Sequence, residues 1–139
     1  MKLLTRVLYD DLEFDGDFPC FNGKLFTGIA YEVYPDGKLH SEYEYREGWE
    51  NNVGKEWYSN GQLKSIELFK NQMAYGTHEK FYEDGSKKSE SDYELGIELE
   101  RRSWSESGEL IEHWKLDPEA HQHHYELLLE RRKQEAENS

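Results

Sequence analysis

The histidines near the C-terminus are the side chains of this sequence that most readily suggest metal or proton chemistry. His121, His123 and His124 form an H-x-H-H pattern. On a helix only His121 and His124 would share a face, and two imidazoles need a further ligand, such as the Glu119 carboxylate, to hold zinc. We interpret the cluster as solvated or stacked histidines, and we expect no metal site there.

An acidic stretch nearer the N-terminus follows the first half of a calcium-binding loop. Residues 11–16 read Asp-Leu-Glu-Phe-Asp-Gly, with carboxylates at alternate positions. The position that should supply a bidentate glutamate carries Asn22, and Pro19 interrupts the segment. We therefore interpret these residues as an acidic strand and turn.

The chain lacks the residue patterns of the common catalytic sites. It contains no G-x-S-x-G, P-loop or H-E-x-x-H motif, and its only cysteine, Cys20, has no histidine nearby in sequence. Pairs of acidic residues are frequent, but 30 aspartates and glutamates among 139 residues produce every spacing by chance. We expect a protein that is not an enzyme and that binds no cofactor.

Size and charge narrow the classes of partner. The length of 139 residues indicates a single small protein, with 35% hydrophobic and 34% charged residues. Its formal net charge of −13 argues against binding nucleic acid or anionic membranes, for which lysine and arginine are needed. The same charge favours a basic protein partner, although it also serves solubility alone. A single cysteine, an N-terminus unlike a signal peptide and the lack of a long apolar stretch favour a cytoplasmic location.

A repeated turn organises most of the sequence. Four dipeptides that favour a two-residue type I′ turn recur at intervals of 24, 24 and 23 residues: Asp36-Gly37, Asn60-Gly61, Asp84-Gly85 and Ser107-Gly108. Four further dipeptides, about half a period away, indicate looser turns: Asn22-Gly23, Glu47-Gly48, Asn71-Gln72 and Leu95-Gly96. The repeat unit is therefore predicted to be a β-hairpin.

These hairpins predict the fold, because one hairpin cannot bury its own face and must pair with the next. We predict a mainly β protein, in which a meander of roughly eight short strands forms a single twisted antiparallel sheet. Asp117 suits a helix N-cap and Pro118 the first helical position, and residues 118–136 contain neither glycine nor proline. One C-terminal helix should therefore cap the open end of the sheet. The predicted domains are the repeat region, residues 1–116, and the capping helix, residues 117–139.

The turn also predicts which residues share a face of the sheet. A type I′ turn at Asp36-Gly37 would pair Tyr34 with Leu39. The regular face then repeats large residues at the strand ends and small ones between them: Gly28, Ala30, Tyr34, Leu39, Ser41 and Tyr45, followed by Tyr58, Leu63, Ser65, Phe69, Gly76, Tyr82, Ser89 and Tyr93. The opposite face mixes aromatic residues with charges, and it includes His40, Lys64 and Lys88.

Exposed aromatic residues among charges are typical of protein-binding surfaces. We select eight residues of the opposite face as candidate partner-binding residues: Tyr31, Glu42, Glu44, Trp57, Glu79, Phe81, Glu90 and Trp104. The alternative is that these rings only cover the second side of a thin sheet.

Residues 33–39, 57–63 and 81–87 read Val-Tyr-Pro-Asp-Gly-Lys-Leu, Trp-Tyr-Ser-Asn-Gly-Gln-Leu and Phe-Tyr-Glu-Asp-Gly-Ser-Lys. These segments resemble the MORN repeat (membrane occupation and recognition nexus), and more closely its variant common in bacteria. Residues 21–31 resemble the opening of bacterial antitoxins and of immunity proteins of polymorphic toxins. The resemblance covers residues 21 to about 116, with departures at Lys87, Ser105 and Gln72.

The resemblance implies a protein that binds other proteins. The leading hypothesis is a stoichiometric inhibitor, an antitoxin or immunity protein that neutralises a toxin domain, for which a basic nuclease would suit the acidic charge. The alternative is a scaffold or dimerisation module whose exposed aromatic row pairs with a second copy. Membrane binding, which the motif's name suggests, is disfavoured by the charge of −13.

Overall fold

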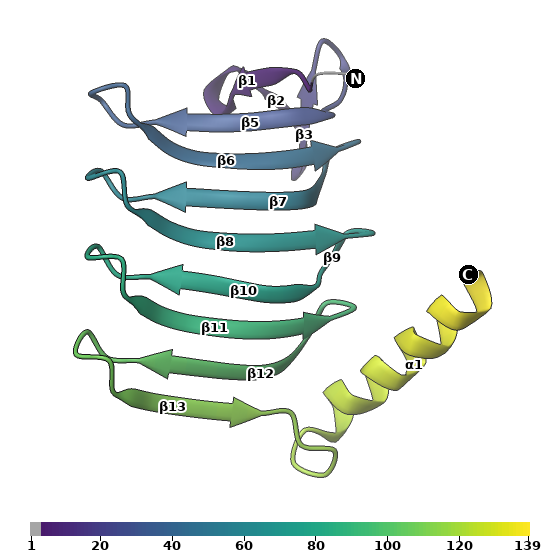
Figure 1. The fold of residues 1–139 in the computed structure, drawn as a ribbon. Coiled ribbons are helices and arrows are strands. Elements are labelled where there is room, and N and C mark those ends of the chain that lie inside the picture. The colour runs from purple at the N-terminus through teal and green to yellow at the C-terminus, as the bar shows by residue number, and fades with distance from the viewer. Residues whose placement is uncertain (1–3) are drawn as a thin grey trace.

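The computed structural model describes residues 4–139, which form a mainly β protein with one C-terminal helix (Figure 1). A ten-stranded sheet contains most of the chain, and a separate three-stranded sheet lies near the N-terminus. The predicted fold class, a meander of β-hairpins followed by a single helix, is confirmed.

The long strands of the large sheet pair antiparallel in chain order, two strands to each repeat. They are β5 (Gly28–Val33), β6 (Leu39–Arg46), β7 (Trp49–Trp57), β8 (Leu63–Lys70), β10 (Gly76–Phe81), β11 (Lys87–Glu94), β12 (Ile97–Trp104) and β13 (Leu110–Lys115). The short strand β9 (Met73–Ala74) pairs with the end of β8. Each repeat therefore lies beside the repeats that precede and follow it in sequence.

The N-terminal segment forms elements that the repeat pattern did not predict. Strand β1 (Arg6–Leu8) pairs with β5 in the parallel direction, so the large sheet is mixed rather than purely antiparallel. The short 3-10 helix η1 (Tyr9–Asp11) then leads into a small sheet of three strands: β2 (Glu13–Asp15), β3 (Phe18–Phe21) and β4 (Lys24–Leu25). Parallel strands need a long crossover between them, and the small sheet is part of that crossover.

The predicted type I′ geometry of the Asp-Gly turns is wrong. Gly37 has a φ of 86°, but Asp36 is not among the residues with positive φ. The Gly37 N–H donates to the Tyr34 oxygen at 2.8 Å, and the Tyr34 N–H donates to the Lys38 oxygen at 2.8 Å. This is a three-residue loop, a type I turn followed by a left-handed glycine. The Asp36 side chain accepts a hydrogen bond from the Lys38 N–H at 2.9 Å, which favours this loop.

The two-residue turns lie at the other end of the strands, where looser turns were expected. Glu47 and Gly48 have φ values of 47° and 83°, and the flanking residues Arg46 and Trp49 pair with each other. The turns at residues 22–23, 71–72 and 95–96 also place two residues at positive φ between paired neighbours. Both loop types use Asn-Gly or Asp-Gly sequences, so the dipeptide alone does not distinguish them.

The strand bodies nevertheless keep the predicted register. Gly28 pairs with Tyr45 and Ala30 with Tyr43, as the predicted turn would require. The register shifts by one residue next to the three-residue loop, where Val33 pairs with Leu39. This bulge compensates for the extra loop residue, so the faces of the strand bodies are unchanged.

The bulge does move two sets of residues, each at an equivalent position in successive repeats, to the face opposite to the predicted one. The column of Leu39, Leu63, Lys87 and Leu110 pairs with the column of Val33, Trp57, Phe81 and Trp104, on the opposite face. The residues that follow this set in sequence, His40, Lys64 and Lys88, lie on the regular face instead. They pack against Tyr34, Tyr58 and Tyr82. The rings of His40 and Tyr34 lie 4.6 Å apart, and the ammonium groups of Lys64 and Lys88 lie 5.5 and 5.6 Å from the rings of Tyr58 and Tyr82.

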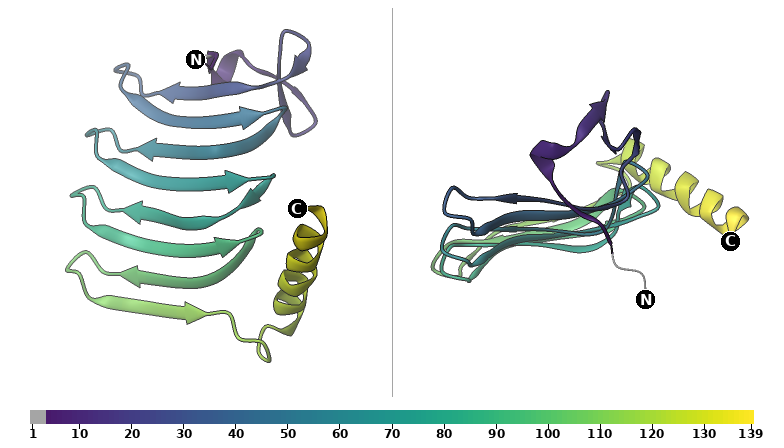
Figure 2. Two further views of the ribbon diagram at one scale, coloured as in Figure 1. Left: turned by 45° about the vertical axis from the view of Figure 1, so that its right-hand side comes forward. Right: turned by 90° about the horizontal axis from the view of Figure 1, so that it is seen from above.

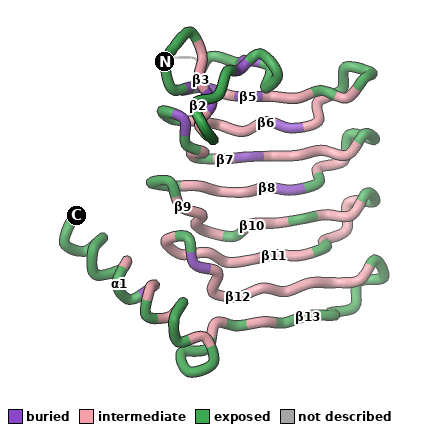
Figure 3. Tube along the Cα trace, turned by 180° about the vertical axis from the view of Figure 1, so that it is seen from behind, coloured by how far each residue is buried: buried purple, intermediate pink, exposed green. Residues whose placement is uncertain are grey.

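The main hydrophobic core lies at the N-terminal end of the large sheet (Figure 3). Val7, Leu12, Phe26 and Ala30 are buried there, and Tyr45 packs against them. Because Ala30 and Tyr45 belong to the regular face, the N-terminal segment covers the first repeat on that face, and it stands on one side of the sheet in Figure 2. Both faces of the later repeats remain largely half-buried.

The C-terminal helix α1 (Gln122–Asn138) begins later than predicted. The Asp117 carboxylate accepts hydrogen bonds from the N–H groups of Glu119 and Ala120 at 2.9 and 2.7 Å, but it caps a separate turn. His121, with φ −120° and ψ 42°, interrupts the helical backbone after that turn.

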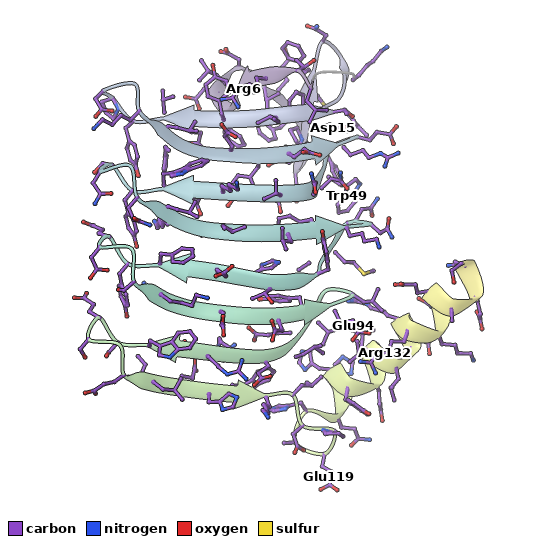
Figure 4. The ribbon with its side chains drawn as sticks, in the orientation of Figure 1. Arg6, Asp15, Trp49, Glu94, Glu119 and Arg132 are labelled. Carbon is purple, nitrogen blue, oxygen red and sulfur yellow. The ribbon has the colours of Figure 1, made fainter. Side chains whose placement is uncertain are left out.

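The helix α1 contacts the turn between β11 and β12 rather than the open edge of the sheet. Arg131 donates to the Leu95 oxygen at 2.7 Å, Arg132 binds both carboxylate oxygens of Glu94, and Leu128 is buried. Figure 4 shows Arg132 reaching from the helix towards Glu94 at the strand ends. Within residues 4–139, no strand pairs with the outer edge of β13, which the helix was expected to cap.

Candidate functional site

The eight candidate residues of the opposite face are all half-buried. Cross-strand pairing places Tyr31 opposite Glu42, and Glu79 opposite Glu90, in one row across the sheet. Glu44 lies in the neighbouring row, opposite Ile29. The structure therefore brings the candidates together on one face, and their role in binding stays a prediction.

Three candidate carboxylates of this face, those of Glu42, Glu79 and Glu90, have basic neighbours within the chain, whereas Glu44 accepts a hydrogen bond from the Asn52 amide at 3.2 Å. Arg6 lies 2.8 Å from Glu42, and its guanidinium also lies 4.6 Å from the centre of the Tyr31 ring. Lys87 lies 2.8 Å from Glu79 and 3.0 Å from Glu90, and hydrogen bonds to these two carboxylates raise the pKa of its ammonium group. The opposite face is consequently less available to a basic partner than its glutamates suggested.

The aromatic column of the opposite face also has a structural role, through its backbone. The Tyr34 hydroxyl donates to the Trp57 oxygen at 2.6 Å, and the Tyr58 hydroxyl donates to the Phe81 oxygen at 2.7 Å. A third bond, from Tyr82 to the oxygen of Trp104 in the last hairpin, measures 2.7 Å. The fourth copy carries Ser105 instead of tyrosine, and in the described part of the chain the helix α1 follows this copy rather than another hairpin.

The regular face is hollowed beyond the part that the N-terminal segment covers. A groove of about 780 Å³ runs over the later repeats, with Ser65, Ser89 and Ser103 in a row along it. These serines are short, so larger neighbours such as His78 and Tyr93 stand beside the row and form the groove. The rings of these two residues lie 4.5 Å apart.

Four glutamates of the regular face lie near the first two repeats, at positions 32, 50, 56 and 67. Among residues 4–139 none of the four makes an ion pair. Burial, together with the charges of Glu67, Glu56 and Glu50, raises the pKa of Tyr43. Burial and then the charge of Glu67 also raise the pKa of Glu50. The negative charge of this region is therefore not compensated by an ion pair within the described residues.

Sequence reasoning missed these glutamates as candidates, although a signal was present. Pairing across the Asn60-Gly61 turn places Glu56 opposite Ser65 and Glu67 opposite Gly54, on the regular face. The face of Glu50 could not be predicted in this way, because the register between β6 and β7 shifts between Tyr43 and Tyr45.

The other candidates from the sequence do not converge on a site. The His121 ring accepts a hydrogen bond from the Asp117 N–H and packs in a tilted arrangement against the Trp114 ring, with ring centres 5.1 Å apart. Cys20 is half-buried beside the Phe18 oxygen. In the described part of the chain, no three histidine, cysteine or acidic side chains gather as a metal site would require. Within the same residues, no helix has the length and apolar character needed to cross a membrane.

Three of the long hairpins match a known repeat family. Residues 26–47, 50–71 and 74–94 match the MORN repeat variant, and each match contains one hairpin with a three-residue loop. This confirms the resemblance to the variant repeat, and the likeness to antitoxins and immunity proteins stays a proposal. No curated protein shows significant similarity to the chain.

One solved structure aligns with the chain at low similarity. The crystal structure of accessory secretory protein 1, 2 and 3 in Streptococcus pneumoniae aligns with a TM-score of 0.38 and 19% sequence identity. The alignment covers 84% of the present chain and 21% of that chain, so the present chain spans about a fifth of its length.

Proposed function

We propose that this chain, in which residues 26–47, 50–71 and 74–94 match the MORN repeat variant, is a non-enzymatic protein-binding module that holds a basic segment of its partner on the regular face. The observation that carries the proposal is the contrast between three glutamates of the opposite face and the glutamates of the regular face near the first two repeats. Glu42, Glu79 and Glu90 of the opposite face have basic neighbours within the chain, whereas Glu56 and Glu67 of the regular face have none within residues 4–139. Unpaired carboxylates attract a cationic partner and orient it during encounter.

The specific form that we propose is an inhibitor that binds and neutralises a basic toxin domain in the cytoplasm. The net charge of −13 supports this form, since complementary charge accelerates the capture of a basic protein. The test is co-expression with a basic toxin domain, which the inhibitor form predicts to be encoded by a neighbouring gene. The wild-type chain should restore growth, and the double variant Glu56→Lys, Glu67→Lys should not. If neither the wild type nor the double variant restores growth, the inhibitor form is overturned.

Zero-length crosslinking tests the binding face independently of toxicity. A carbodiimide joins carboxylates to partner lysines in direct contact, and mass spectrometry identifies the joined residues. We expect crosslinks at Glu32, Glu50, Glu56 or Glu67. Crosslinks confined to Glu42, Glu79 and Glu90 would move the contact to the opposite face and overturn the proposed one.

A second candidate function, a scaffold or dimerisation module, is favoured by the outer edge of β13. Leu110 and Ile111 on this strand are 54% and 65% exposed, and an unpaired edge can add a strand from a second copy. Sedimentation equilibrium distinguishes this candidate. A dimer that dissociates in the variant Ile111→Lys would support it, and a monomer at every concentration would exclude it.

A further inference from the structure

A cavity of about 500 Å³ lies where the N-terminal small sheet meets the regular face of the first two repeats. Six aromatic side chains, each from a different element, line it: Tyr9, Phe14, Phe18, Tyr45, Trp49 and Phe69. Figure 4 shows Trp49 at the start of β7, beside the N-terminal segment. The volume is within the range of roughly 300–1,000 Å³ that is typical of ligand pockets.

The local backbone positions the rings in pairs. The two-residue turn at Glu47-Gly48 brings Trp49 against Phe18, with ring centres 5.0 Å apart in an edge-to-face arrangement. A side chain at position 48 would meet the Phe18 Cβ at 3.4 Å and the Leu25 side chain at 3.1 Å, so glycine permits this approach. Tyr9 and Phe14 form a second pair with ring centres 5.5 Å apart.

Aromatic surface remains open to solvent around this cavity. Tyr9, Phe14 and Trp49 are 36%, 46% and 41% exposed. Three large rings left exposed around one cavity indicate a surface that a ligand covers.

The charged residues that line the cavity are both acidic, Asp17 and Glu50. Glu50 is half-buried, and within residues 4–139 it has neither an ion pair nor a side-chain hydrogen bond. Burial and the charge of Glu50 raise the pKa of Tyr45 to about 12. Since the faces of aromatic rings also attract cations, rings and carboxylates here select the same class of ligand.

We propose that this cavity receives the cationic side chain of an arginine or lysine from the bound partner. A cation would contact the rings and pair with Glu50, whereas an apolar side chain would bury that carboxylate without a partner. The inference rests on the proposed function, in which a basic segment of the partner lies on the regular face. It adds the place where one basic residue of that segment is anchored.

Titration of the full chain with short peptides tests the anchor without the natural partner. The probes are acetyl-Gly-Arg-Gly-amide and acetyl-Gly-Lys-Gly-amide, and the matched neutral control replaces arginine with citrulline, which has the same shape without the charge. The indole N–H resonance of Trp49 is the reporter, and those of Trp57, Trp104 and Trp114 are internal references. We expect saturable shifts of Trp49 alone with both basic peptides, and affinity about tenfold weaker for the citrulline peptide.

Two variants locate the binding chemistry. Glu50→Gln should weaken the arginine peptide about tenfold and reduce its salt dependence, whereas the exposed helix variant Glu126→Gln should bind like the wild type. Trp49→Ala should abolish saturable binding, here followed through the backbone amide of residue 50, and a thermal melt verifies that the variant is folded. If Trp49→Ala unfolds, Trp49→Leu removes the π face with less loss of volume.

The outcomes separate this inference from the proposed function. Equal binding of the arginine and citrulline peptides, or unchanged binding by Glu50→Gln, would overturn the cation anchor. Carbodiimide crosslinks at Glu56 and Glu67 would still support the proposed face in that case. Peptide binding in the cavity without partner crosslinks on the regular face would support the anchor and count against the proposed contact face.

Discussion

The Tyr58 hydroxyl donates a 2.7 Å hydrogen bond to the backbone oxygen of Phe81, which lies 23 residues later in the next repeat. The same bond joins Tyr34 to Trp57 and Tyr82 to Trp104. Successive hairpins are thus connected beside their three-residue loops by side-chain bonds as well as by the sheet ladder. In a repeat protein such contacts between neighbours supply much of the stability.

Removing one of these hydroxyls should weaken the contact between repeats. We expect Tyr58→Phe to lower the free energy of unfolding by about 1 kcal/mol, since the Phe81 oxygen loses its side-chain donor. Urea denaturation followed by circular dichroism measures the change. Tyr75→Phe is the control, because that residue shares no such bond in the described structure. Equal midpoints for Tyr58→Phe and the wild type would contradict the structural role of the ladder.

The three-residue loops should require glycine at one position only. Gly61 has a φ of 88°, so Gly61→Val should destabilise by roughly 1–3 kcal/mol through backbone strain. Ser59 occupies the position that Pro35 holds in the first loop, and both loops contain the same backbone hydrogen bonds. Ser59→Pro should therefore stabilise by roughly 0.4–1 kcal/mol, because proline restricts the unfolded chain. A lower melting temperature for Ser59→Pro would argue against the type I turn.

The attachment of the C-terminal helix should depend on pH through Glu94. Hydrogen bonds from Arg132 hold the pKa of the Glu94 carboxyl below its ordinary value of 4.5. The ionised form is therefore favoured in the folded state, and its contribution is present above pH 4.5 and lost as the pH falls through the lowered pKa. Both side chains are more than a third exposed, so we expect Arg132→Gln to cost less than about 1 kcal/mol at neutral pH.

Paired melts of wild type and Arg132→Gln across this pH range measure that contribution. The difference between the two proteins should shrink to nothing in acid. A difference that stays constant from neutral pH to pH 3 would assign the effect of Arg132 to packing instead.

The contribution of Glu50 to stability should depend on pH in the opposite direction to that of Glu94. Burial and Glu67 raise the pKa of this carboxyl above 4.5, so the folded state binds its proton more tightly than the unfolded chain does. Its stabilising contribution is present below pH 4.5 and is lost as the pH rises through the raised pKa. The neutral variant Glu50→Gln should therefore equal the wild type in acid and exceed its stability at neutral pH. Glu126→Gln on the exposed helix should show no such crossover in the same series of melts.

Charge reversal should affect the two faces differently. Glu42→Lys places a second cation beside Arg6, so it should destabilise, by up to about 1 kcal/mol for a pair this exposed. Glu67→Lys relieves repulsion near Glu50 and Glu56, so it should not destabilise and should lower the pKa of Glu50. Chemical melts and an NMR titration of Glu50 measure these effects. A destabilised Glu67→Lys with an unchanged Glu50 titration would remove the case for an uncompensated acidic region.

The repeat, the order of the long hairpin strands and the faces of their strand bodies were determined by the sequence alone. Alternation along a strand and the spacing of turns are local properties, so Gly28, Ala30, Ser41 and Tyr45 could be assigned to one face correctly. The choice between loop types could not be made locally. Asp36-Gly37 and Asn22-Gly23 carry similar dipeptides, and the position at which the flanking strands start to pair decides whether two or three residues form the loop.

The candidate binding surfaces depended on contacts between distant segments. Arg6 neutralises Glu42 only because β1 adds to the sheet in parallel, and the pairing of Lys87 with Glu79 follows from the bulge beside its loop. The aromatic cavity joins Tyr9, Trp49 and Phe69, which lie 40 and 20 residues apart. Tertiary structure alone decided which charges are compensated and which rings share a cavity, because both follow from distances through space that no local pattern of residues encodes.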